Sequence, residues 1–473
     1  MRPPDPLVDA ARRFLDDLMP ILKEKCPGER DEPLELLGFP RWIPEPRRGP
    51  GPEEHLPRRY KAVPVSLTAE QQCAARVLGE LRQAAIQPLA DLDRALAADP
   101  VIGPRLDHEV SSSSRGGQTW QAASMIQQLV DRVIGVATLF NLPPPIRDAV
   151  TTQWAELLRR PSDQMNVIVA LHEFHAPAVP IQLEPGLEID ELSEAEIASA
   201  LALGAGRVGL MMDERSVSRV FGIRKSFESQ LFIDGVPAVE SEREMAVRRE
   251  ARQHAELVLL ALRVSKAGRV GTSGSFEHSV SWGADIAPAS GRFGSLFGWP
   301  AAEPYALADE EVMQFREFWF AFERVHAERA IAGALRRFGF AADRALPDDE
   351  IVDLMIAAES LFLSEMDEQY RGELRFRLST RAGSLLGTTL EDRLRVFKFM
   401  RRAYDARSVV VHGGVPSEDN LRGLDSERST VYAFADDLEN VLRDALKMAI
   451  RLLASDQRFP PDWEELMFAV PGT

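Results

Sequence analysis

An arginine and a histidine stand five positions apart in the stretch YDARSVVVHGG, residues 404–414. Histidine titrates near neutrality, so His412 can take a proton from a ribose 2′-hydroxyl or return one to the leaving 5′-oxygen. Arg407 carries a planar fork of donors that can hold a phosphate as its negative charge grows. The pair therefore predicts metal-independent cleavage of RNA, with a 2′,3′-cyclic phosphate as the product. DNA lacks the attacking hydroxyl and should survive.

Helix geometry sets a condition on this chemistry. On one unbroken helix, residues five apart project about 140° from each other, so the two side chains would not meet at one point. The three valines and Gly413–Gly414 favour a helix end here, which would free His412 to turn. A second copy crossing at this end would place two Arg/His pairs around one cleft, so we expect a homodimer with a shared site. The alternative is a histidine that only caps the last carbonyls of its helix.

The helix expected over Leu390–Val411 begins with a capping box of Thr388 and Glu391. Its packed face should carry four large side chains, Leu394, Phe397, Met400 and Tyr404. Between Thr389 and His412 the chain has three acidic residues against six basic ones, Arg393, Arg395, Lys398, Arg401, Arg402 and Arg407. The candidates for contact with an RNA backbone are Arg395, Lys398, Arg401 and Arg402. The alternative is a solvated helix face.

Glu359 is expected on the packed side of a helix over Asp349–Leu363. A buried carboxylate needs a partner, because leaving it unpaired costs several kcal/mol or forces it to protonate. The candidate partners are Arg377, Arg381 and Arg407. A pair with Arg407 would position the reacting arginine, whereas a pair with Arg381 would be a structural ion pair in the core. Both alternatives stay open.

Residues from about 303 to 455 resemble the HEPN superfamily, in particular its Apea-like branch. The hallmark of that branch is an arginine, four to six residues and then a histidine, which Arg407 to His412 matches. The upstream stretches IVDLMIAAESLFLSE and ELRFRLSTRAGSLLG have the corresponding order and spacing. The resemblance implies a helical bundle that dimerises into a metal-independent endoribonuclease, an effector of anti-phage defence, abortive infection or a toxin system. Ser408 departs from the family, where an asparagine or larger polar residue commonly follows the arginine.

The expected mechanism assigns roles to individual residues. His412 would be the general acid and base, Arg407 the phosphate clamp, and Glu359 a further member of the catalytic set. The expected supporting residues are Tyr404, Asp405, Ser408 and Arg381. We expect RNA and a second copy of the chain as partners, and no cofactor or metal. The alternatives are a non-catalytic HEPN module for dimerisation or RNA binding, and a structural adaptor.

The fold class expected is mainly α, in three parts. Residues 1–160 should be helical and loop-rich, with irregular structure from Cys26 to Pro64. Residues 161–300 should mix α and β, with strands in 165–190, RVGLMM and VSWGADI and a helix over 241–264. Residues 301–473 should form the bundle, with helices at Asp309–Phe338, Asp349–Leu363, Arg371–Leu386, Leu390–Val411 and Thr430–Ala454. The first 300 residues would sense a trigger, either a ligand or a phage protein, or restrain the nuclease.

The composition of the chain limits which binding partners and which cellular compartment we expect. The 473 residues carry a net charge of −17, so a nucleic acid must be met by a local basic surface. Cys26 and Cys73 form no CxxC pair, so we expect neither a disulfide nor a zinc site and favour a reducing cytoplasm. No apolar run reaches about 18 residues, so we expect no membrane span. We expect LHEFH at 171–175 to be a strand without a metal, and the glycine-rich GRVGTSGSF at 268–276 to be a loop.

Overall fold

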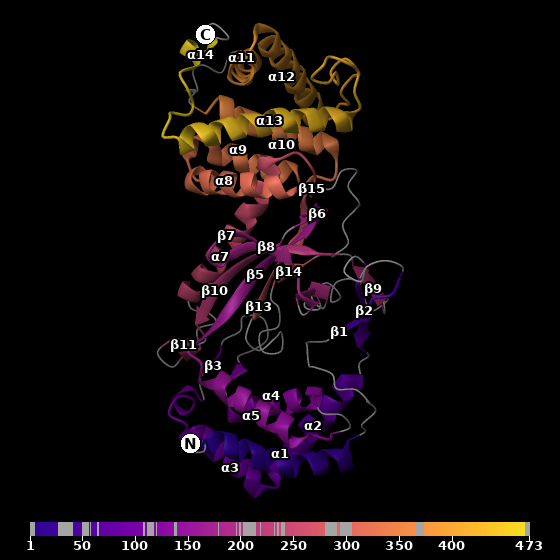
Figure 1. The fold of residues 1–473 in the computed structure, drawn as a ribbon, viewed down its shortest axis with the longest axis vertical. Coiled ribbons are helices and arrows are strands. Elements are labelled where there is room, and N and C mark those ends of the chain that lie inside the picture. The colour runs from indigo at the N-terminus through magenta and orange to yellow at the C-terminus, as the bar shows by residue number, and fades with distance from the viewer. Residues whose placement is uncertain are drawn as a thin grey trace. The chain divides into compact units, whose positions relative to one another are not determined.

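A computed structural model of the chain describes most of its residues. The described residues are 5–26, 41–49, 56, 58–63, 66–106, 109–110, 118–119, 121–136, 140–177, 179–194, 196–197, 200–201, 214–217, 219–230, 232–233, 236–237, 242–279, 291–293, 305–364 and 373–468. They are mainly helical, as predicted (Figure 1). The chain divides into two compact units: unit 1 holds 1–170, 184–255 and 272–297, and unit 2 holds 171–183, 256–271 and 298–473.

The N-terminal part of unit 1 is helical, which confirms the prediction for this segment. Its helices are α1 (Pro6–Lys25), α2 (Ser66–Gln83), α3 (Gln87–Ala98), α4 (Ala122–Val136) and α5 (Pro144–Arg159), with a short 3₁₀ turn η2 (Gly103–Arg105). Asp5 caps α1 by accepting from the amide of Leu7 at 3.0 Å. Arg159 at the end of α5 forms ion pairs with Asp5 and Asp99. It therefore joins the end of α5 to the start of α1 and to the end of α3.

The structure overturns the prediction for the cysteines. Cys26 and Cys73 form a disulfide, with Cα atoms 5.9 Å apart and a separation of 47 positions in sequence. Both are buried in the hydrophobic core that α1–α5 share. The spacing along the chain does not reveal this pair, because only the packing of α1 against α2 brings the two residues together.

The remaining strands of unit 1 form antiparallel sheets. One sheet has the order β14-β13-β5-β10-β8, from β14 (Gly291–Phe293), β13 (Gly271–Ser279), β5 (Ser162–His172), β10 (Phe221–Gln230) and β8 (Leu187–Glu191). Another has the order β1-β2-β9, from β1 (Arg41–Glu45), β2 (Arg58–Val63) and β9 (Glu214–Val217). Two-residue strands pair as β3 (Glu109–Val110) with β4 (Gln118–Thr119) and as β11 (Phe232–Ile233) with β12 (Val236–Pro237).

The sequence predictions about this region have different outcomes. The strands predicted within 165–190 are confirmed, and so is the long helix at 241–264, which is α7 (Glu242–Ser265). Two predictions of irregular structure are wrong, because β1 and β2 lie in the segment from Cys26 to Pro64 and β13 occupies most of GRVGTSGSF. Strand pairing across the sheet overrides the local glycine and proline signal. The strands predicted at RVGLMM and VSWGADI lie outside the described residues.

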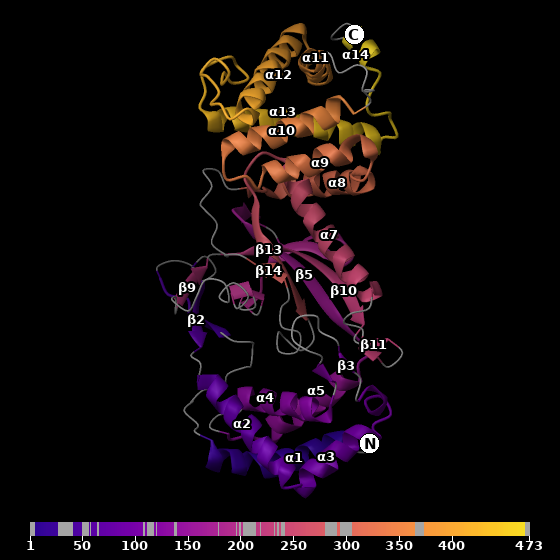
Figure 2. The same cartoon turned by 180° about the vertical axis from the view of Figure 1, so that it is seen from behind.

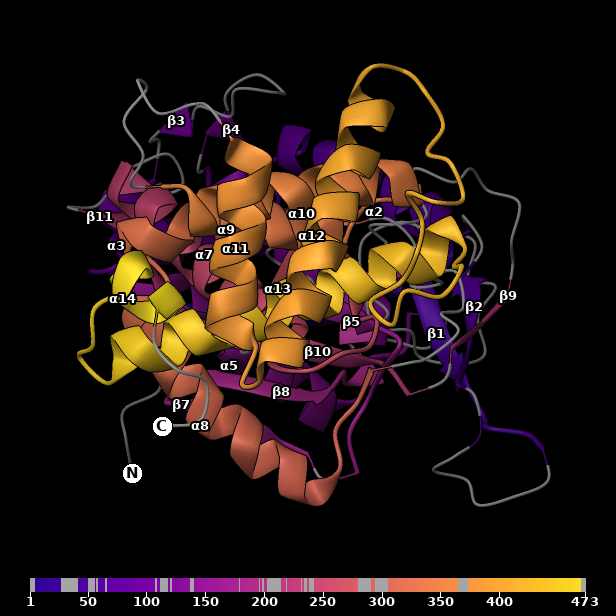
Figure 3. The same cartoon turned by 90° about the horizontal axis from the view of Figure 1, so that it is seen from above.

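Unit 2 is a helical bundle. It contains α8 (Asp309–Val325), α9 (Arg329–Ala341), α10 (Pro347–Phe362), α11 (Leu374–Leu386), α12 (Leu390–Val411), α13 (Val431–Ala454) and α14 (Trp463–Phe468), with short strands β6 (Phe174–His175), β7 (Ile181–Glu184) and β15 (Tyr305–Ala306). Both side views show α10 and α13 lying between α8–α9 and α11–α12 (Figures 1 and 2). Seen from above, α11 and α12 lie side by side across α13 (Figure 3). This layer of α10 and α13 forms the centre of the bundle.

The predicted helix over Asp309–Phe338 is wrong in one respect, because it breaks at 326–328 into α8 and α9. The buried stripe of α8 ends at Val325, and that of α9 begins at Ile331. Six residues turn a helix by about 600°, so one straight helix would point these two side chains about 120° apart. The break lets both pack into the bundle. The other predicted bundle helices are confirmed to within a few residues.

Candidate functional site

Helix α12 ends at Val411, as the sequence predicted, because the glycines after it form a helix-ending turn. The amide of Gly414 donates to the carbonyl of Val409 at 2.9 Å, and the amide of Gly413 donates to Val410 at 2.9 Å. Gly413 has φ of 77°, a left-handed conformation that glycine adopts without strain. These features make a Schellman motif with His412 at the C-cap.

The helix begins differently from the prediction. The N-cap is Thr389, whose hydroxyl accepts from the amide of Asp392 at 3.1 Å, rather than Thr388 with Glu391. The buried face also differs, because it carries Val396, Phe399, Met400, Ala403 and Ala406. Leu394, predicted to be packed, is 44% exposed. The positions of α10, α11 and α13 decide which of two apolar stripes is buried, and helical spacing alone does not distinguish them.

His412 is exposed at this helix end. Its amide donates to the carbonyl of Ser408 at 3.3 Å, and its backbone angles of φ −87° and ψ 10° stay near the helical path. The expectation that the helix end frees His412 to turn is therefore wrong. Arg407 and His412 leave the helix in directions about 140° apart. One copy of the chain does not aim them at a single point.

Arg407 lies beside Glu359 of α10. Its Nη2 is 3.8 Å from a carboxylate oxygen of Glu359, and the two side chains are 26% and 27% exposed. This contact decides between the partners left open by the sequence in favour of Arg407, although Glu359 is half-buried rather than buried. The Nε of Arg407 is buried and has no hydrogen-bond partner among the described residues. Arg407 is therefore held loosely by one acid and keeps donors for a further acceptor.

The predicted supporting residues have separate contacts. Asp405 accepts from Arg375 of α11, which links α11 to α12. Arg381 donates to the carbonyl of Phe362, and its guanidinium lies 5.0 Å from the ring centre of Trp463. Ser408 and Tyr404 are half-buried. These contacts position α12 against its neighbours, and Ser408 supports His412 only through its backbone carbonyl.

The four arginines and lysines predicted to contact RNA fall into two groups. Arg402 donates to the carbonyls of Arg422 and Gly423 at 3.1 and 2.8 Å, and burial lowers its pKa. It therefore holds the loop after α12. Arg395, Lys398 and Arg401 remain at the surface or half-buried, with Arg395 3.2 Å from Asp392. Of the four, these three are the ones that an external phosphate can reach.

The sequence analysis missed a carboxylate cluster between α10 and α13. Glu350 of α10 and Asp436 and Glu439 of α13 have oxygens within 4.8 Å of one another, a spacing that a metal ion could bridge. Arg269 already lies there, 3.8 Å from Glu350 and 3.5 Å from Asp436. Burial and the neighbouring acids raise the pKa of Glu350 to about 7. The signal was hard to see because the acids belong to helices more than 80 residues apart.

Comparison with known proteins adds no relative. No family model, no curated protein and no solved structure matches the chain. Within the described part of the chain, none of the helices combines the length and apolar character needed to span a membrane. The functional argument therefore depends on the residues and their geometry.

Proposed function

We propose that the C-terminal bundle is a metal-independent endoribonuclease of the HEPN type, active as a homodimer. The observation that carries this proposal is the arrangement around the end of α12. Arg407 has a buried, unpartnered Nε and a loose contact with Glu359, and His412 is exposed five residues later. A half-buried guanidinium with free donors suits a phosphate whose charge grows during cleavage.

The proposed mechanism assigns one role to each group. His412 removes the proton from the 2′-hydroxyl, the oxygen attacks the adjacent phosphorus, and the 5′-oxygen leaves with a proton returned by histidine. Arg407 binds the phosphate through its Nη atoms, because its Nε is buried. Glu359 keeps the guanidinium oriented, because its carboxylate contacts Nη2 on one side only. The acids and bases named here balance the protons without a metal ion.

The homodimer explains how separated side chains serve one bond. The two groups diverge on one helix, so His412 of one copy would act with Arg407 of the other. Val411 and Val415 flank His412 and are 53% and 87% exposed, which leaves apolar surface for a second copy. Cleavage of RNA would suit a role in anti-phage defence or as a toxin. Residues 1–300 would then sense the trigger or restrain cleavage.

The test uses the full chain with total RNA and EDTA. Cleavage by the parent and loss of at least a hundredfold in His412→Ala and Arg407→Gln are expected, with products ending in a 2′,3′-cyclic phosphate. An RNA with a single 2′-deoxyribose at the cleaved position should survive. His175→Ala is the matched control, because His175 is exposed on β6 and lies outside the proposed site.

Mixing the two inactive variants tests the shared site. A dimer of Arg407→Gln with His412→Ala keeps one intact arginine and one intact histidine, each from a different copy. Recovered activity supports cleavage between subunits, whereas no recovery indicates that both groups act from one copy. RNA binding without cleavage by the parent would instead support a non-catalytic HEPN module for RNA binding or dimerisation, and would overturn the nuclease.

A further inference from the structure

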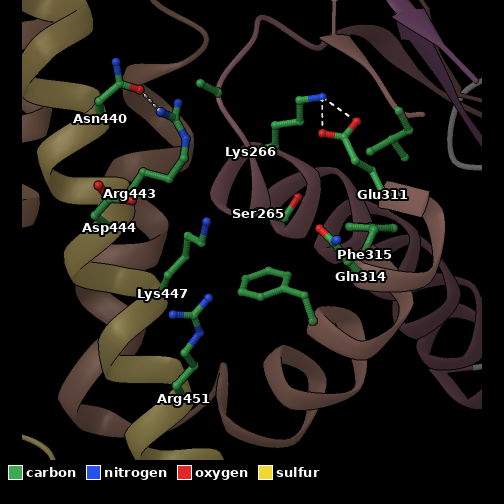
Figure 4. Close-up of a pocket in the computed structure, with 13 residues that line it drawn as sticks. Ser265, Lys266, Glu311, Gln314, Phe315, Asn440, Arg443, Asp444, Lys447 and Arg451 are labelled. Carbon is green, nitrogen blue, oxygen red and sulfur yellow. Dashed lines mark hydrogen bonds and ion pairs between the residues drawn. The ribbon is translucent and has the colours of Figure 1, made fainter. Parts of the chain in front are cut away.

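A pocket of 430 Å³ lies within unit 2, away from the end of α12 (Figure 4). Its walls are the C-terminal end of α7, one face of α8 and the second half of α13. This volume is within the range of about 300–1,000 Å³ for small-molecule sites. The residues from α13 recur every three or four positions and so share one helix face: Asn440, Arg443, Asp444, Lys447 and Arg451.

Two of the cations around this pocket are already neutralised. The Nζ of Lys266 lies 2.6 Å from both carboxylate oxygens of Glu311. Arg443 is 3% exposed, donates from Nε to the carbonyl of Arg263 at 2.9 Å, and has Nη2 2.8 Å from Glu439. These contacts join the end of α7 to the start of α8 and to the middle of α13.

Lys447 and Arg451 are different. Within the described ranges, neither side chain makes a hydrogen bond or an ion pair within 4.0 Å. Figure 4 shows both projecting from α13 towards α8 and the end of α7. Burial lowers the pKa of Lys447, and the charges of Arg451 and Arg443 lower it further, against an opposing effect of Asp444. Two neighbouring cations that face a cavity without an acid partner are stabilised by an anion in that cavity.

The rest of the lining indicates which anion. Phe318 of α8 is half-buried and borders the pocket beside the buried Phe315, which gives an aromatic surface for a planar ring. On the opposite side from α13, Gln314 supplies an amide that can donate and accept (Figure 4). The hydroxyl of Ser265 is already bonded to the carbonyl of Leu262 at 3.0 Å and to the hydroxyl of Tyr305 at 2.9 Å. A ligand with a phosphate at one end and a flat, polar-edged ring at the other matches both surfaces.

We propose that this pocket binds a nucleoside phosphate, with its phosphate between Lys447 and Arg451 and its base along Phe318. Arg451 supplies a guanidinium fork and Lys447 a compact ammonium, the two groups that proteins use most for phosphate. The amide of Gln314 donates to and accepts from the edge of the base. Nucleotide binding at this pocket does not depend on RNA cleavage by Arg407 and His412. A binding measurement alone therefore tests it.

Isothermal titration calorimetry on the full chain tests it with AMP, GMP, ADP, inorganic phosphate and adenosine as probes. At least one of the nucleotides should bind, with phosphate and adenosine each at least tenfold weaker. Lys447→Met and Arg451→Met should each weaken that nucleotide about tenfold, because a hydrogen bond to a charged group is lost. Arg336→Met is the matched control: it removes an exposed charge of α9 outside the pocket and should change nothing.

Two results would overturn the proposal. One is the absence of binding by every nucleotide, or binding by phosphate or adenosine as strong as the nucleotide's. The other is binding that Lys447→Met and Arg451→Met leave unchanged. Lys447→Arg guards against misfolding, since it keeps the charge and should retain binding while Lys447→Met loses it. Equal melting temperatures of the variants and the parent confirm that the fold is intact.

Discussion

The buried Glu350 gives a stability prediction whose sign and size both follow from the structure. Glu350 is 5% exposed, and its pKa is raised from 4.5 to about 7 by burial and by Glu439. Arg269, 3.8 Å away, opposes this rise but is itself 57% exposed. A carboxyl whose pKa is raised in the folded state contributes stability that is fully present below pH 4.5 and is lost as the pH rises through about 7.

Replacing Glu350 by glutamine removes this titration. One unit of pKa is worth about 1.4 kcal/mol, so a rise of the Glu350 pKa from 4.5 to about 7 lowers the parent's free energy of unfolding by about 3 kcal/mol once the pH has reached about 8. Glu350→Gln should therefore have nearly the parent's stability at pH 5 and exceed it by up to about 3 kcal/mol at pH 8. The glutamine amide keeps the size of the side chain and can donate to the neighbouring acids.

Urea unfolding followed by tryptophan fluorescence at pH 5, 6, 7 and 8 measures the difference between variant and parent. The matched control is Glu391→Gln, the same change in the first turn of α12 at an exposed position. The gain of about 3 kcal/mol between pH 5 and pH 8 is expected for Glu350→Gln and not for this control. A constant difference for Glu350→Gln would refute the reasoning, because it would mean that the carboxyl titrates alike in the folded and unfolded chain.

Three further substitutions test contacts within single units by thermal unfolding. Removing the disulfide in the double variant Cys26→Ser, Cys73→Ser opens a loop of 47 residues and should cost about 4 kcal/mol. Gly383→Ala should cost about 1–3 kcal/mol, because the new Cβ would lie 2.7 Å from a backbone carbonyl of α12. Arg443→Met should lower the free energy of unfolding by at least about 3 kcal/mol. The substitution removes the hydrogen bond to the carbonyl of Arg263 and leaves Glu439 without its ion-pair partner. Parent-like melting of any of these variants would contradict the corresponding contact.

The elements that could be predicted from the sequence are those whose signals are local. The period of the bundle helices, the cap at Thr430 and the glycines after Val411 lie within the helices they define, and α10 to α13 follow the predicted ranges closely. Strand β5 is a long β-branched run, so its pattern was also visible. A helix or strand whose signals all lie within its own residues can be predicted without knowing which elements pack against it.

The features that could not be predicted depend on distant partners. Strands β1 and β13 lie in proline- and glycine-rich stretches and exist because β2 and β5 pair with them. The disulfide needs α1 and α2 to pack, and the nucleotide pocket needs α7, α8 and α13, of which α13 begins more than 100 residues after α8 ends. Nothing in the sequence around Lys447 and Arg451 shows that a cavity lies in front of them.

Packing of α12 explains why the proposed reaction needs two copies. Its buried stripe ends at Ala406, so the next residue, Arg407, lies at the edge of the core where α10 presents Glu359. His412 follows more than one turn later, after the core has ended, and its near-helical backbone fixes its direction away from Arg407. Rotating α12 to expose Arg407 on the side of His412 would take Ala406 out of the core.

A charged residue in place of Val415 tests this reasoning. Val415 is 87% exposed, so Val415→Glu should leave the fold of each copy intact, yet it would place a charge in the proposed contact between copies. The variant should sediment as a monomer and lose RNA cleavage together with dimer formation, although Arg407 and His412 are unchanged. A monomer that cleaves RNA at the parent's rate would mean that one helix can present both groups to one phosphate, and the geometric argument for a shared site would then be wrong.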